Sequence, residues 1–382
     1  MSAAHTPVES PTRRIRVCLV GPSLKIVGGQ AVILQRLRAR LETVPGLLIT
    51  FLPVNPDLPG VLGALQRIKY VRTVVTSVAY VWSLLRTLRH VDVVHAFSAS
   101  YWSFLLAPVP ALVVARLFRI PSILNYRSGE ASDHLATWKS ASFFTRWASA
   151  VVVPSGYLVE VFARFGHSAH AVANFVEMDH IAYRERLQLT PRFFGNRNLE
   201  PMYNVACVVR AFAKIQALRP DASLVLAGDG SERASLTTLV AELGLNHVQF
   251  IGRISPADMS RWYHESDVYL NAPDIDNMPN SVIEAFAAGL PVVTTNAGGI
   301  PFVVRHDDNG LMVACGDHQA LATQALRLFH EPHLAQRLAD RARADVLDRY
   351  TWTAVQAQWV RLYQQLAQRS SVPAPTRAAP SR

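Results

Sequence analysis

Three carboxylates lie close together in residues 272–293, "APDIDNMPNSVIEAFAAGLPVV". Asp274 and Asp276 form an Asp-x-Asp pair, and Glu284 follows in what reads as a helix. An Asp-x-Asp pair can hold a divalent metal against a diphosphate, because hard cations prefer carboxylate oxygens. Asp276 and Glu284 can instead act together in a site without a metal, as acceptors for sugar hydroxyl groups. These two arrangements belong to different classes of enzyme.

The position of Glu284 follows from the elements on either side of it. "SDVYLNAP" is typical of a buried strand, and "SVIEAFAAG" predicts a helix that begins beyond the carboxyl end of that strand. Backbone N–H groups at a helix N-terminus bind phosphate. Glu284, a turn into the helix, would repel that phosphate but can accept hydrogen bonds from the hydroxyls of a ribose beside it. Asp276, in the loop before the helix, can face a second set of hydroxyls, such as those of a hexose.

Apolar strand patterns alternate with helical patterns along most of the chain. Alternation of this kind predicts an α/β fold with doubly wound parallel sheets, which bind ligands at the carboxyl ends of their strands. We expect two successive Rossmann-like domains. Their predicted strands are 15–21, 47–53, 91–97, 121–126, 149–153 and 170–173 in the first, and 193–197, 222–227, 247–251, 267–271 and 291–295 in the second.

Polar residues near the middle of the 382-residue chain mark the domain boundary. A helical pattern follows the second domain, and the last residues are rich in Pro, Ala and Ser, which do not favour folding. The expected division is a disordered N-terminus at 1–14, a first domain at 15–178, a linker at 179–192, a second domain at 193–350, a C-terminal helix at 351–369 and a disordered tail at 370–382.

The formal net charge of +10 comes from the first half of the chain. Residues 1–190 contain 20 Lys and Arg against 10 Asp and Glu, whereas residues 191–382 contain 18 of each kind. This asymmetry indicates an anionic partner, such as an anionic membrane surface or an acidic substrate, or a general bias toward arginine. The arginines form no recognisable nucleic-acid-binding motif, so we expect no nucleic acid as a partner.

The first residues lack the apolar core of a secretory signal, which favours a cytoplasmic location. Residues 93–115 contain no charged side chain, but their prolines and serines favour a strand and a buried helix over a membrane span. Residues 62–90 predict a basic helix with aromatic side chains. Such a helix either packs on a sheet or lies in a membrane interface, and the second case would make the protein peripheral at the inner face of the membrane.

Residues 276–301, "DNMPNSVIEAFAAGLPVVTTNAGGIP", resemble the signature of retaining glycosyltransferases of the GT-B fold, family 4 (glycosyl transferases group 1). In that family, seven residues separate two acids ahead of an Ala-x-x-x-Gly-x-Pro-Val-Val run. The resemblance implies that Glu284 holds the ribose of a nucleotide sugar and that Asp276 contacts the donor sugar. The family more often has Glu at the first position, so Asp276 is a shortened variant.

Other stretches extend the resemblance over most of the chain. "VCLVGPSLKIVGGQAV" is similar to the family's first strand and glycine-rich loop, "LVLAGDGSER" to its Ala-Gly-x-Gly strand end, and "VQFIGRIS" to the loop that receives the nucleotide base. "RYTWTAVQAQWVRLY" resembles its C-terminal helix, which crosses back to a first domain that faces the second across a cleft. The donor-binding residues implied in this way are Gly28, Gly29, Gly228, Gly230, Gly252, Arg253, Asn280 and Ser281.

The family's phosphate clamp is an Arg followed five or six residues later by a Lys. Here Arg197 occupies the first position, and the Lys position falls on Met202 or Tyr203. The diphosphate of a donor would then be held by Arg197, Tyr203, Asn204 and backbone N–H groups.

The first domain departs further from the family pattern. Many family members have a sugar-contacting His near the end of the fourth strand, where this chain reads "ILNYRSGEASDH". The corresponding acceptor-side residues are Tyr126, Arg127 and Glu130. His95, in "DVVHAFSAS", is the candidate for a catalytic histidine that faces the cleft, and it can equally be a buried histidine that closes a strand.

The resemblance implies retaining transfer of a sugar from a nucleoside diphosphate donor to an acceptor hydroxyl, with Asp276, Glu284, Arg197 and His95 as the catalytic residues. We expect no cofactor and no metal, because Asp274 and Asp276 have no nearby His or further carboxylate to complete an octahedral set. The expected acceptor is a glycan or a lipid-linked molecule in surface polysaccharide or glycolipid assembly. The alternative is a protein that binds a nucleotide sugar or a glycan without turning it over.

Overall fold

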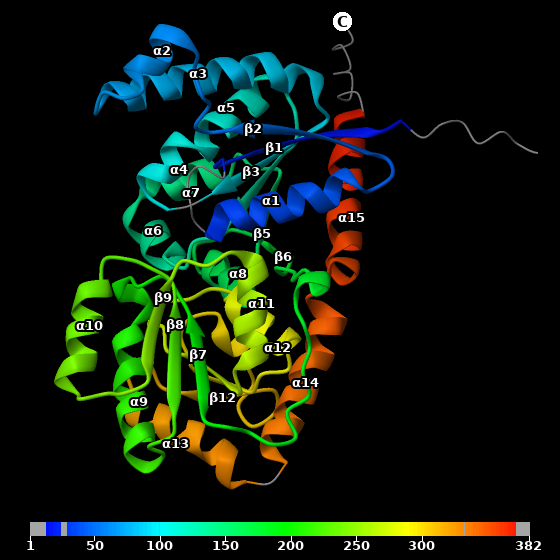
Figure 1. Ribbon diagram of the computed structural model, residues 1–382. Helices are drawn as coiled ribbons and strands as arrows, with labels where there is room; N and C mark the ends of the chain where they lie inside the picture. Colours follow the sequence, from blue (N-terminus) through cyan, green and yellow to red (C-terminus); the bar gives the residue numbers. More distant parts are fainter. Residues whose placement is uncertain (1–12, 24–28, 99, 332, 372–382) are drawn as a thin grey trace, which may run out of the picture. The chain divides into compact units, whose positions relative to one another are not determined.

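The computed structural model describes residues 13–23, 29–98, 100–331 and 333–371 (Figure 1). The chain divides into two compact units, one formed by residues up to 152 with 162–170 and those from 358 onward, the other by 153–161 and 171–357. Each unit contains a six-stranded sheet. The expected α/β fold with two Rossmann-like sheets is confirmed, and all eleven predicted strands are present with ends within two residues of the prediction.

The first unit has the strand order β2-β1-β3-β4-β5-β6. Because β2 and β3 pair with opposite sides of β1, the order reverses there, and such a reversal is where doubly wound sheets bind ligands. The strands are β1 (Ile15–Gly21), β2 (Leu47–Pro53), β3 (Val93–Ser98), β4 (Ser122–Tyr126), β5 (Ala150–Val153) and β6 (His170–Ala171). The helices are α1 (Gly29–Glu42), α2 (Gly60–Leu65), α3 (Val71–Thr87), α4 (Trp102–Leu106), α5 (Pro108–Leu117), α6 (Ala131–Thr137), α7 (Lys139–Thr145) and α8 (Gly156–Arg164).

The uncharged stretch 93–115 folds as expected into a strand and a buried helix. Every residue of β3 is buried, which is typical of a parallel strand covered on both faces. Pro108 opens α5 at a position where its missing N–H costs nothing, and most of that helix is buried. Across the part of the chain that the structure describes, no helix is both long and apolar enough to cross a membrane.

The second unit has the order β12-β11-β10-β7-β8-β9, which reverses between β7 and β10. Its strands are β7 (Arg192–Asn196), β8 (Ser223–Ala227), β9 (Val248–Gly252), β10 (Val268–Asn271), β11 (Val292–Thr295) and β12 (Leu311–Val313), and all are parallel. Its helices are α9 (Val205–Leu218), α10 (Arg233–Glu242), α11 (Pro256–Glu265), α12 (Asn280–Ala287), α13 (His318–His330) and α14 (Leu334–Arg349). Sequence patterns did not predict β12, because three residues are too few to show a period.

The segment expected to be a linker, residues 179–192, packs on the second unit. Arg186 is buried and donates hydrogen bonds to the carbonyl oxygens of Tyr263, Ser266 and Ala288. Asp267 is also buried and accepts from Arg184 at 2.5 Å. Burial opposes the charge of Asp267, but its hydrogen-bonded partners outweigh that effect and lower its pKa. The polar composition of this segment therefore reflects a set of buried hydrogen bonds.

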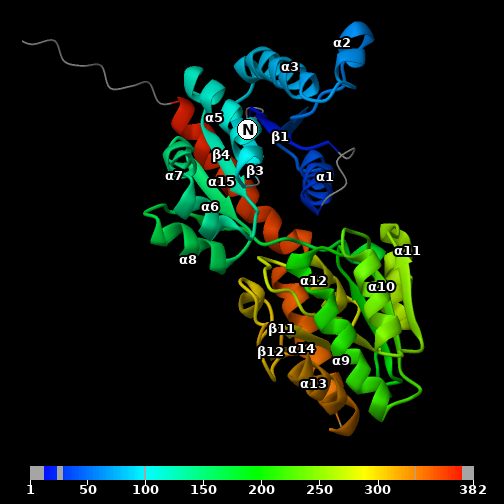
Figure 2. The ribbon, with the colours of Figure 1, turned by 90° about the vertical axis from the view of Figure 1, so that its left-hand side faces the viewer.

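The last helix, α15 (Trp352–Ser371), belongs to both units, because its residues up to 357 cluster with the second and those from 358 with the first. His95 of β3 lies under it. The Nε2 atom of His95 accepts from Asn125 Nδ2 at 2.9 Å, and Nδ1 lies 2.7 Å from the hydroxyl oxygen of Tyr363. The ring stacks between Phe97 and Trp359. Figure 2 shows α15 running along the elements of the first unit.

This arrangement corrects the expectation that His95 is a catalytic residue. The side chain is fully buried, and both ring nitrogens have partners within the protein. Burial, with a smaller contribution from the charge of Arg127, lowers the pKa of His95 to about 3. His95 is a neutral core residue that joins β3 and β4 to the C-terminal helix.

The buried neutral His95 predicts a pH-dependent stability. Its stabilising contribution is complete above pH ~6.5, where the unfolded histidine is also neutral, and is lost as the pH falls from ~6.5 toward the folded pKa of about 3. In urea titrations, the free energy of unfolding of the wild type should therefore fall over this range by up to ~1.4 kcal/mol per pH unit more than that of His95→Gln. The exposed control His90→Gln should follow the wild type. Parallel curves for the wild type and His95→Gln would contradict this assignment.

Two consecutive glycines hold the loop between β10 and α12 in place. A side chain on Gly298 would meet the carbonyl oxygen of Asp276 at 2.2 Å, and one on Gly299 would meet that of Asn277 at 1.8 Å. The amide of Gly299 donates to the carbonyl oxygen of Asp276 at 3.0 Å. "NAGGIP" therefore contains glycines because two backbone segments touch, and this contact fixes the loop that carries Asp276.

Gly299→Ala should destabilise the second unit by more than about 2 kcal/mol, because the backbone carbonyl of Asn277 has to move. The control Gly244→Ala places a side chain in open space at φ +61°, so it should cost about 1 kcal/mol of backbone strain. Thermal or urea unfolding of the two variants measures the difference. Equal losses would mean that the close contact at Gly299 is unimportant.

Candidate functional site

An ion pair spans the point where the second sheet reverses its strand order. Arg197 follows β7 and Asp276 follows β10, and these strands are neighbours. The Arg197 Nη2 and Asp276 Oδ2 atoms are 2.6 Å apart, and the two side chains are only 13% and 9% exposed. Because parallel strands end at the same edge, two residues 79 positions apart meet at the edge where such sheets bind ligands.

Further contacts orient the guanidinium of Arg197. Its Nη1 atom donates to the Ser281 hydroxyl at 3.2 Å, and its Cζ atom lies 4.0 Å from the centre of the Tyr203 ring. Burial opposes the charge, but Asp276 and the neighbouring tyrosines outweigh it and raise the pKa of Arg197. Arg197 is therefore a permanently charged group in a fixed position. Among the predicted clamp residues, Tyr203 supports it as an aromatic platform.

The two aspartates of the Asp-x-Asp pair have different partners. Asp276 pairs with Arg197, and its Oδ1 atom also accepts from the Asn277 amide at 2.7 Å. Asp274 accepts from Asn204 Nδ2 at 3.0 and 3.2 Å. Asn204 caps α9 by accepting from the Cys207 amide, so Asp274 is tied to the start of that helix. Within the described ranges, no three His, Cys, Asp or Glu side chains form a group that could hold a metal.

Glu284 lies on α12, and its Oε2 atom accepts from the Tyr263 hydroxyl at 3.1 Å. The same hydroxyl lies 3.2 Å from the carbonyl oxygen of Ser281 and accepts from Asn196 Nδ2 at 2.8 Å. Since Arg197 also donates to the Ser281 hydroxyl, polar contacts through Ser281 connect the surroundings of the two carboxylates. We call the residues Asp276, Arg197, Ser281, Tyr263 and Glu284 the carboxylate network.

The start of α12 is fixed from another segment of the second unit. Asn280 is its first residue, and its Oδ1 atom accepts from Asn174 Nδ2 at 2.7 Å. Asn174 also contacts the carbonyl oxygen of Met278 at 3.3 Å. The predicted donor residues Asn280 and Ser281 therefore both lie at this helix start, one held by Asn174 and the other by Arg197.

The glycines predicted to bind the donor have different roles in the structure. A side chain on Gly228 would meet the carbonyl oxygen of Arg197 at 2.1 Å, and one on Gly230 would meet that of Leu199 at 2.4 Å. These glycines let β8 approach the segment that carries Arg197. Gly252 has φ +70° with open space around it, and Arg253 after it is exposed. Gly29 begins α1, and Gly28 lies outside the described residues.

The predicted acceptor-side residues of the first unit separate into two kinds. Tyr126 is fully buried, with its hydroxyl 2.8 Å from both Ser100 Oγ and His134 Nδ1, so the structure corrects its expected contact with an acceptor. Arg127 donates to Asn125 at 3.2 Å, and its Nε and Nη2 atoms are buried without a hydrogen-bond partner in the described protein. Glu130 is half-buried beside the start of α6.

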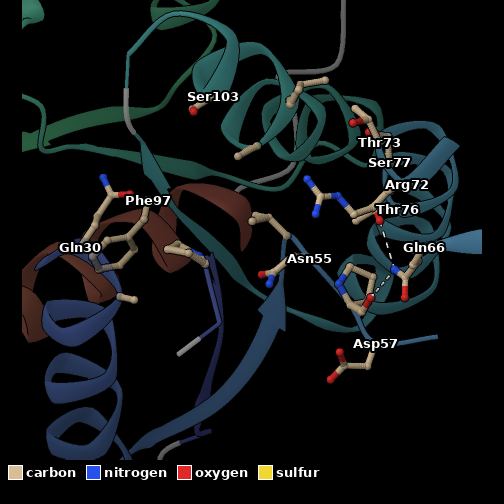
Figure 3. Close-up of a pocket in the computed structure, with 16 residues that line it drawn as sticks. Gln30, Asn55, Asp57, Gln66, Arg72, Thr73, Thr76, Ser77, Phe97 and Ser103 are labelled. Carbon is tan, nitrogen blue, oxygen red and sulfur yellow. Dashed lines mark hydrogen bonds between the residues drawn. The ribbon is translucent and has the colours of Figure 1, made fainter. Parts of the chain in front are cut away.

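The first unit has a pocket of about 800 Å³ next to its own strand-order reversal (Figure 3). Its polar lining residues include Asn55 after β2, Gln66 after α2, and Arg72, Thr76 and Ser77 from α3. Amide and hydroxyl groups of this kind suit a ligand rich in hydroxyls. Phe97 closes one side of the pocket, and Arg127 lies 5.9 Å from the centre of its ring.

Sequence reasoning missed Tyr263, Asn196 and Asn174. Tyr263 lies on α11, outside every stretch that resembles the signature, and only the fold brings it to Glu284. Asn196 immediately precedes the predicted Arg197, so its place at the end of a predicted strand was the one available signal. Asn174 lies near the start of residues 171–357 of the second unit, and no role was predicted for it from the sequence.

The residues of the carboxylate network lie in a part of the chain that is similar to a known protein family. The glycosyl transferases group 1 family matches residues 191–345, which contain the whole carboxylate network. The chain is 32% identical over 167 residues to the N-acetyl-alpha-D-glucosaminyl L-malate synthase of Bacillus anthracis, and 29% identical over 209 residues to the phosphatidyl-myo-inositol mannosyltransferase of Mycobacterium leprae. These matches cover 44% and 53% of this chain. They cover 43% and 55% of the relatives, so the chain spans about half the length of the curated relatives it matches.

Solved structures match over nearly the whole chain. Anabaena HepE, solved in complex with UDP, has a TM-score of 0.73 at 18% identity and is matched over 92% of this chain and 100% of HepE. Sucrose-phosphate synthase from Thermosynechococcus elongatus also has a TM-score of 0.73, at 21% identity, over 93% of this chain and 100% of its own. These likenesses show that the fold is GT-B. Residues 191–345 of this GT-B chain belong to the glycosyl transferases group 1 family.

Proposed function

We propose that the protein is a retaining, metal-independent glycosyltransferase of family 4, which moves a sugar from a nucleoside diphosphate sugar to an acceptor hydroxyl. The carboxylate network carries this proposal. Its arginine, two carboxylates and helix start lie at the strand-order reversal of a group 1 domain, and they match the chemistry of a diphosphate, a sugar and a ribose. The proposal requires neither a metal nor a cofactor.

Donor binding would rearrange the ion pair. The diphosphate competes with Asp276 for Arg197, because charge-assisted hydrogen bonds from a guanidinium to phosphate are strong. Asp276, released from Arg197, can then accept hydrogen bonds from hydroxyls of the donor sugar. Glu284 can accept from the ribose while Tyr263 holds it in position. In the empty site, the pair keeps two buried charges compensated.

The reaction follows from this arrangement of charges. The bond between the anomeric carbon and the diphosphate oxygen breaks, and Arg197 with the amides at the start of α12 stabilises the charge that develops on the diphosphate. The acceptor oxygen bonds to the anomeric carbon on the same face, and its proton passes to the departing diphosphate. A double displacement would need a carboxylate nucleophile, whereas Asp276 and Glu284 are both assigned to binding hydroxyls. Retention without an enzyme-bound intermediate results.

The proposed acceptor is a glycan or a lipid-linked molecule, in the assembly of a surface polysaccharide or a glycolipid. Two observations support this. The names of several relatives include a lipid, as in the phosphatidyl-myo-inositol mannosyltransferase, and the first unit contains the chain's excess of positive charge. We place the protein in the cytoplasm, at the inner face of an anionic membrane.

One observation favours a second function, binding without turnover. The position where the family has its clamp Lys falls on Met202 or Tyr203, and the Met202 carbonyl accepts hydrogen bonds from the amides of Asp274 and Ile275 at 3.0 and 3.2 Å. Met202 therefore holds the loop that contains Asp274 and Ile275. Arg197 is then the main cation for the diphosphate, and the donor experiment below separates binding from transfer.

The donor is identified by incubating the purified protein with a panel of UDP- and GDP-sugars and following nucleoside diphosphate release. We expect release that persists in EDTA, and a loss of ~100-fold or more in Glu284→Ala because the ribose contact is gone. Glu242→Ala, an exposed glutamate on α10, is the matched control and should be unchanged. Activity abolished by EDTA and restored by Mn²⁺ would refute the metal-independent mechanism, and tight donor binding without release would favour the second function.

Arg197→Gln tests the leaving-group role. The variant lacks the positive charge that stabilises the departing diphosphate, so the rate should fall by ~100-fold or more, mainly in kcat. Arg219 offers a matched control, because it also pairs with an aspartate, at 3.1 Å, and lies over an aromatic ring, at 5.3 Å, but precedes β8 at the opposite edge of the sheet. Arg219→Gln should keep its activity. A similar loss in both variants would indicate general destabilisation, with no special role for Arg197.

A further inference from the structure

The second half of helix α3 packs Tyr80 and Leu84 into the core, whereas its first half is oriented differently. An ordinary surface helix turns its apolar side inward and its polar side to water. The first half of α3 instead directs Arg72, Thr76 and Ser77 into the pocket of the first unit, as Figure 3 shows. The hydroxyl of Thr76 accepts from Gln66 Nε2 at 3.1 Å, which fixes this inward orientation.

The outward side of the same helix is apolar. Val74, Val78 and Trp82 are 64%, 65% and 64% exposed, and they recur every four residues along one face. Helix α2 adds exposed Val61 and Leu62 and has no buried residue. In both ribbon views, α2 and α3 form an outer layer of the first unit (Figures 1 and 2). The α2–α3 apolar face is defined here as Val61, Leu62, Val71, Val74, Val78 and Trp82.

Basic residues border the α2–α3 apolar face. From Leu58 to Val91 the chain has five cationic side chains and no acidic one. Four of them form this border, namely the exposed Arg67, Lys69, Arg86 and Arg89, whereas Arg72 lines the pocket. Within the described residues, none of the five is in an ion pair, so this charge is not neutralised by the protein. An exposed apolar face with an aromatic residue and a cationic border has the composition of a helix that lies in the interface of an anionic bilayer.

We propose that the α2–α3 apolar face is the surface by which this protein docks on an anionic lipid bilayer, with the apolar side chains in the interface and the basic residues on the headgroups. The inference deepens the proposed function and rests on it for the identity of the acceptor as a membrane lipid. The pocket and the docking surface are two sides of α3, so the polar head of an acceptor anchored in the bilayer reaches the pocket from beside this helix.

Vesicle binding by the full chain tests the surface without requiring catalysis. The protein is sedimented with vesicles of phosphatidylcholine alone and of phosphatidylcholine with phosphatidylglycerol. We expect stronger binding to the anionic vesicles, weakened by about 0.5 M NaCl because salt screens the basic residues. The triple variant Val74→Ser/Val78→Ser/Trp82→Ser should lower the partition coefficient by ~10-fold or more, since it removes most of the inserted apolar area.

The matched control removes three exposed apolar residues elsewhere. Leu187→Ser/Leu218→Ser/Leu347→Ser changes side chains of the second unit that are 79%, 70% and 54% exposed, and should bind anionic vesicles like the wild type. Thermal unfolding confirms that both variants are folded. Equal losses in the two variants, or wild-type binding no better to anionic than to neutral vesicles, would overturn the proposal. A dimer in solution that the α3 variant abolishes would assign the face to a second copy of the chain and also overturn it.

The vesicle-binding experiment and the donor experiment can fail independently of each other. Nucleoside diphosphate release is measured in solution without vesicles and depends on the second unit, so the α3 variant should release it like the wild type. Vesicle binding without any release would leave the docking surface standing while the transferase assignment fails. Release without vesicle binding would leave the transferase and remove the docking surface.

Discussion

The buried ion pair between Arg197 and Asp276 is the interaction on which the site depends. Removing two charges from water is expensive, and a pair of this kind recovers the cost only when hydrogen bonds satisfy its remaining groups. Ser281 and the Asn277 amide supply those hydrogen bonds, and the Tyr203 ring lies against the guanidinium. The close backbone contacts at Gly228, Gly298 and Gly299 then hold the two loops that carry the pair. Much of the second unit's carboxyl edge is thus built around one guanidinium that is kept charged.

The fold could be predicted from the sequence because parallel strands leave a strong pattern. Short apolar runs such as "VVHAF", which is buried on both faces, and "SLVLA" are separated by helical periods, and all eleven predicted strands appear. β12 was not predicted, because a strand of three residues is too short to show a periodic pattern. Residues 179–192 were predicted as a linker on the strength of their polarity, yet Arg184 and Arg186 use that polarity for buried hydrogen bonds. Composition does not distinguish a solvated charge from a buried, paired one.

The candidate site could be predicted only in part. Asp276, Glu284 and Ser281 lie in one contiguous stretch, and Arg197 ends a predicted strand, so pattern and resemblance identify them together. Tyr263 and Asn174 enter through tertiary contacts that no local pattern encodes. His95 and Tyr126 show the converse, because both were candidates to contact a ligand and both instead form hydrogen bonds within the core. Whether such a residue faces a ligand depends on which distant segment covers it.

The C-terminal helix has a consequence for how the chain folds as it is synthesised. The core of the first unit includes Trp359 and Tyr363, and the polar groups of His95 are satisfied only when Tyr363 is present. Domains generally fold as units, starting from the N-terminus as the chain leaves the ribosome. Here the first sheet emerges early, but His95 of β3 lacks its contacts with Trp359 and Tyr363 until the whole second unit and α15 have been made. Most of the second unit's core does not require the part of α15 from residue 358 onward, so this unit can complete its folding first. The N-terminal sheet then completes its core last.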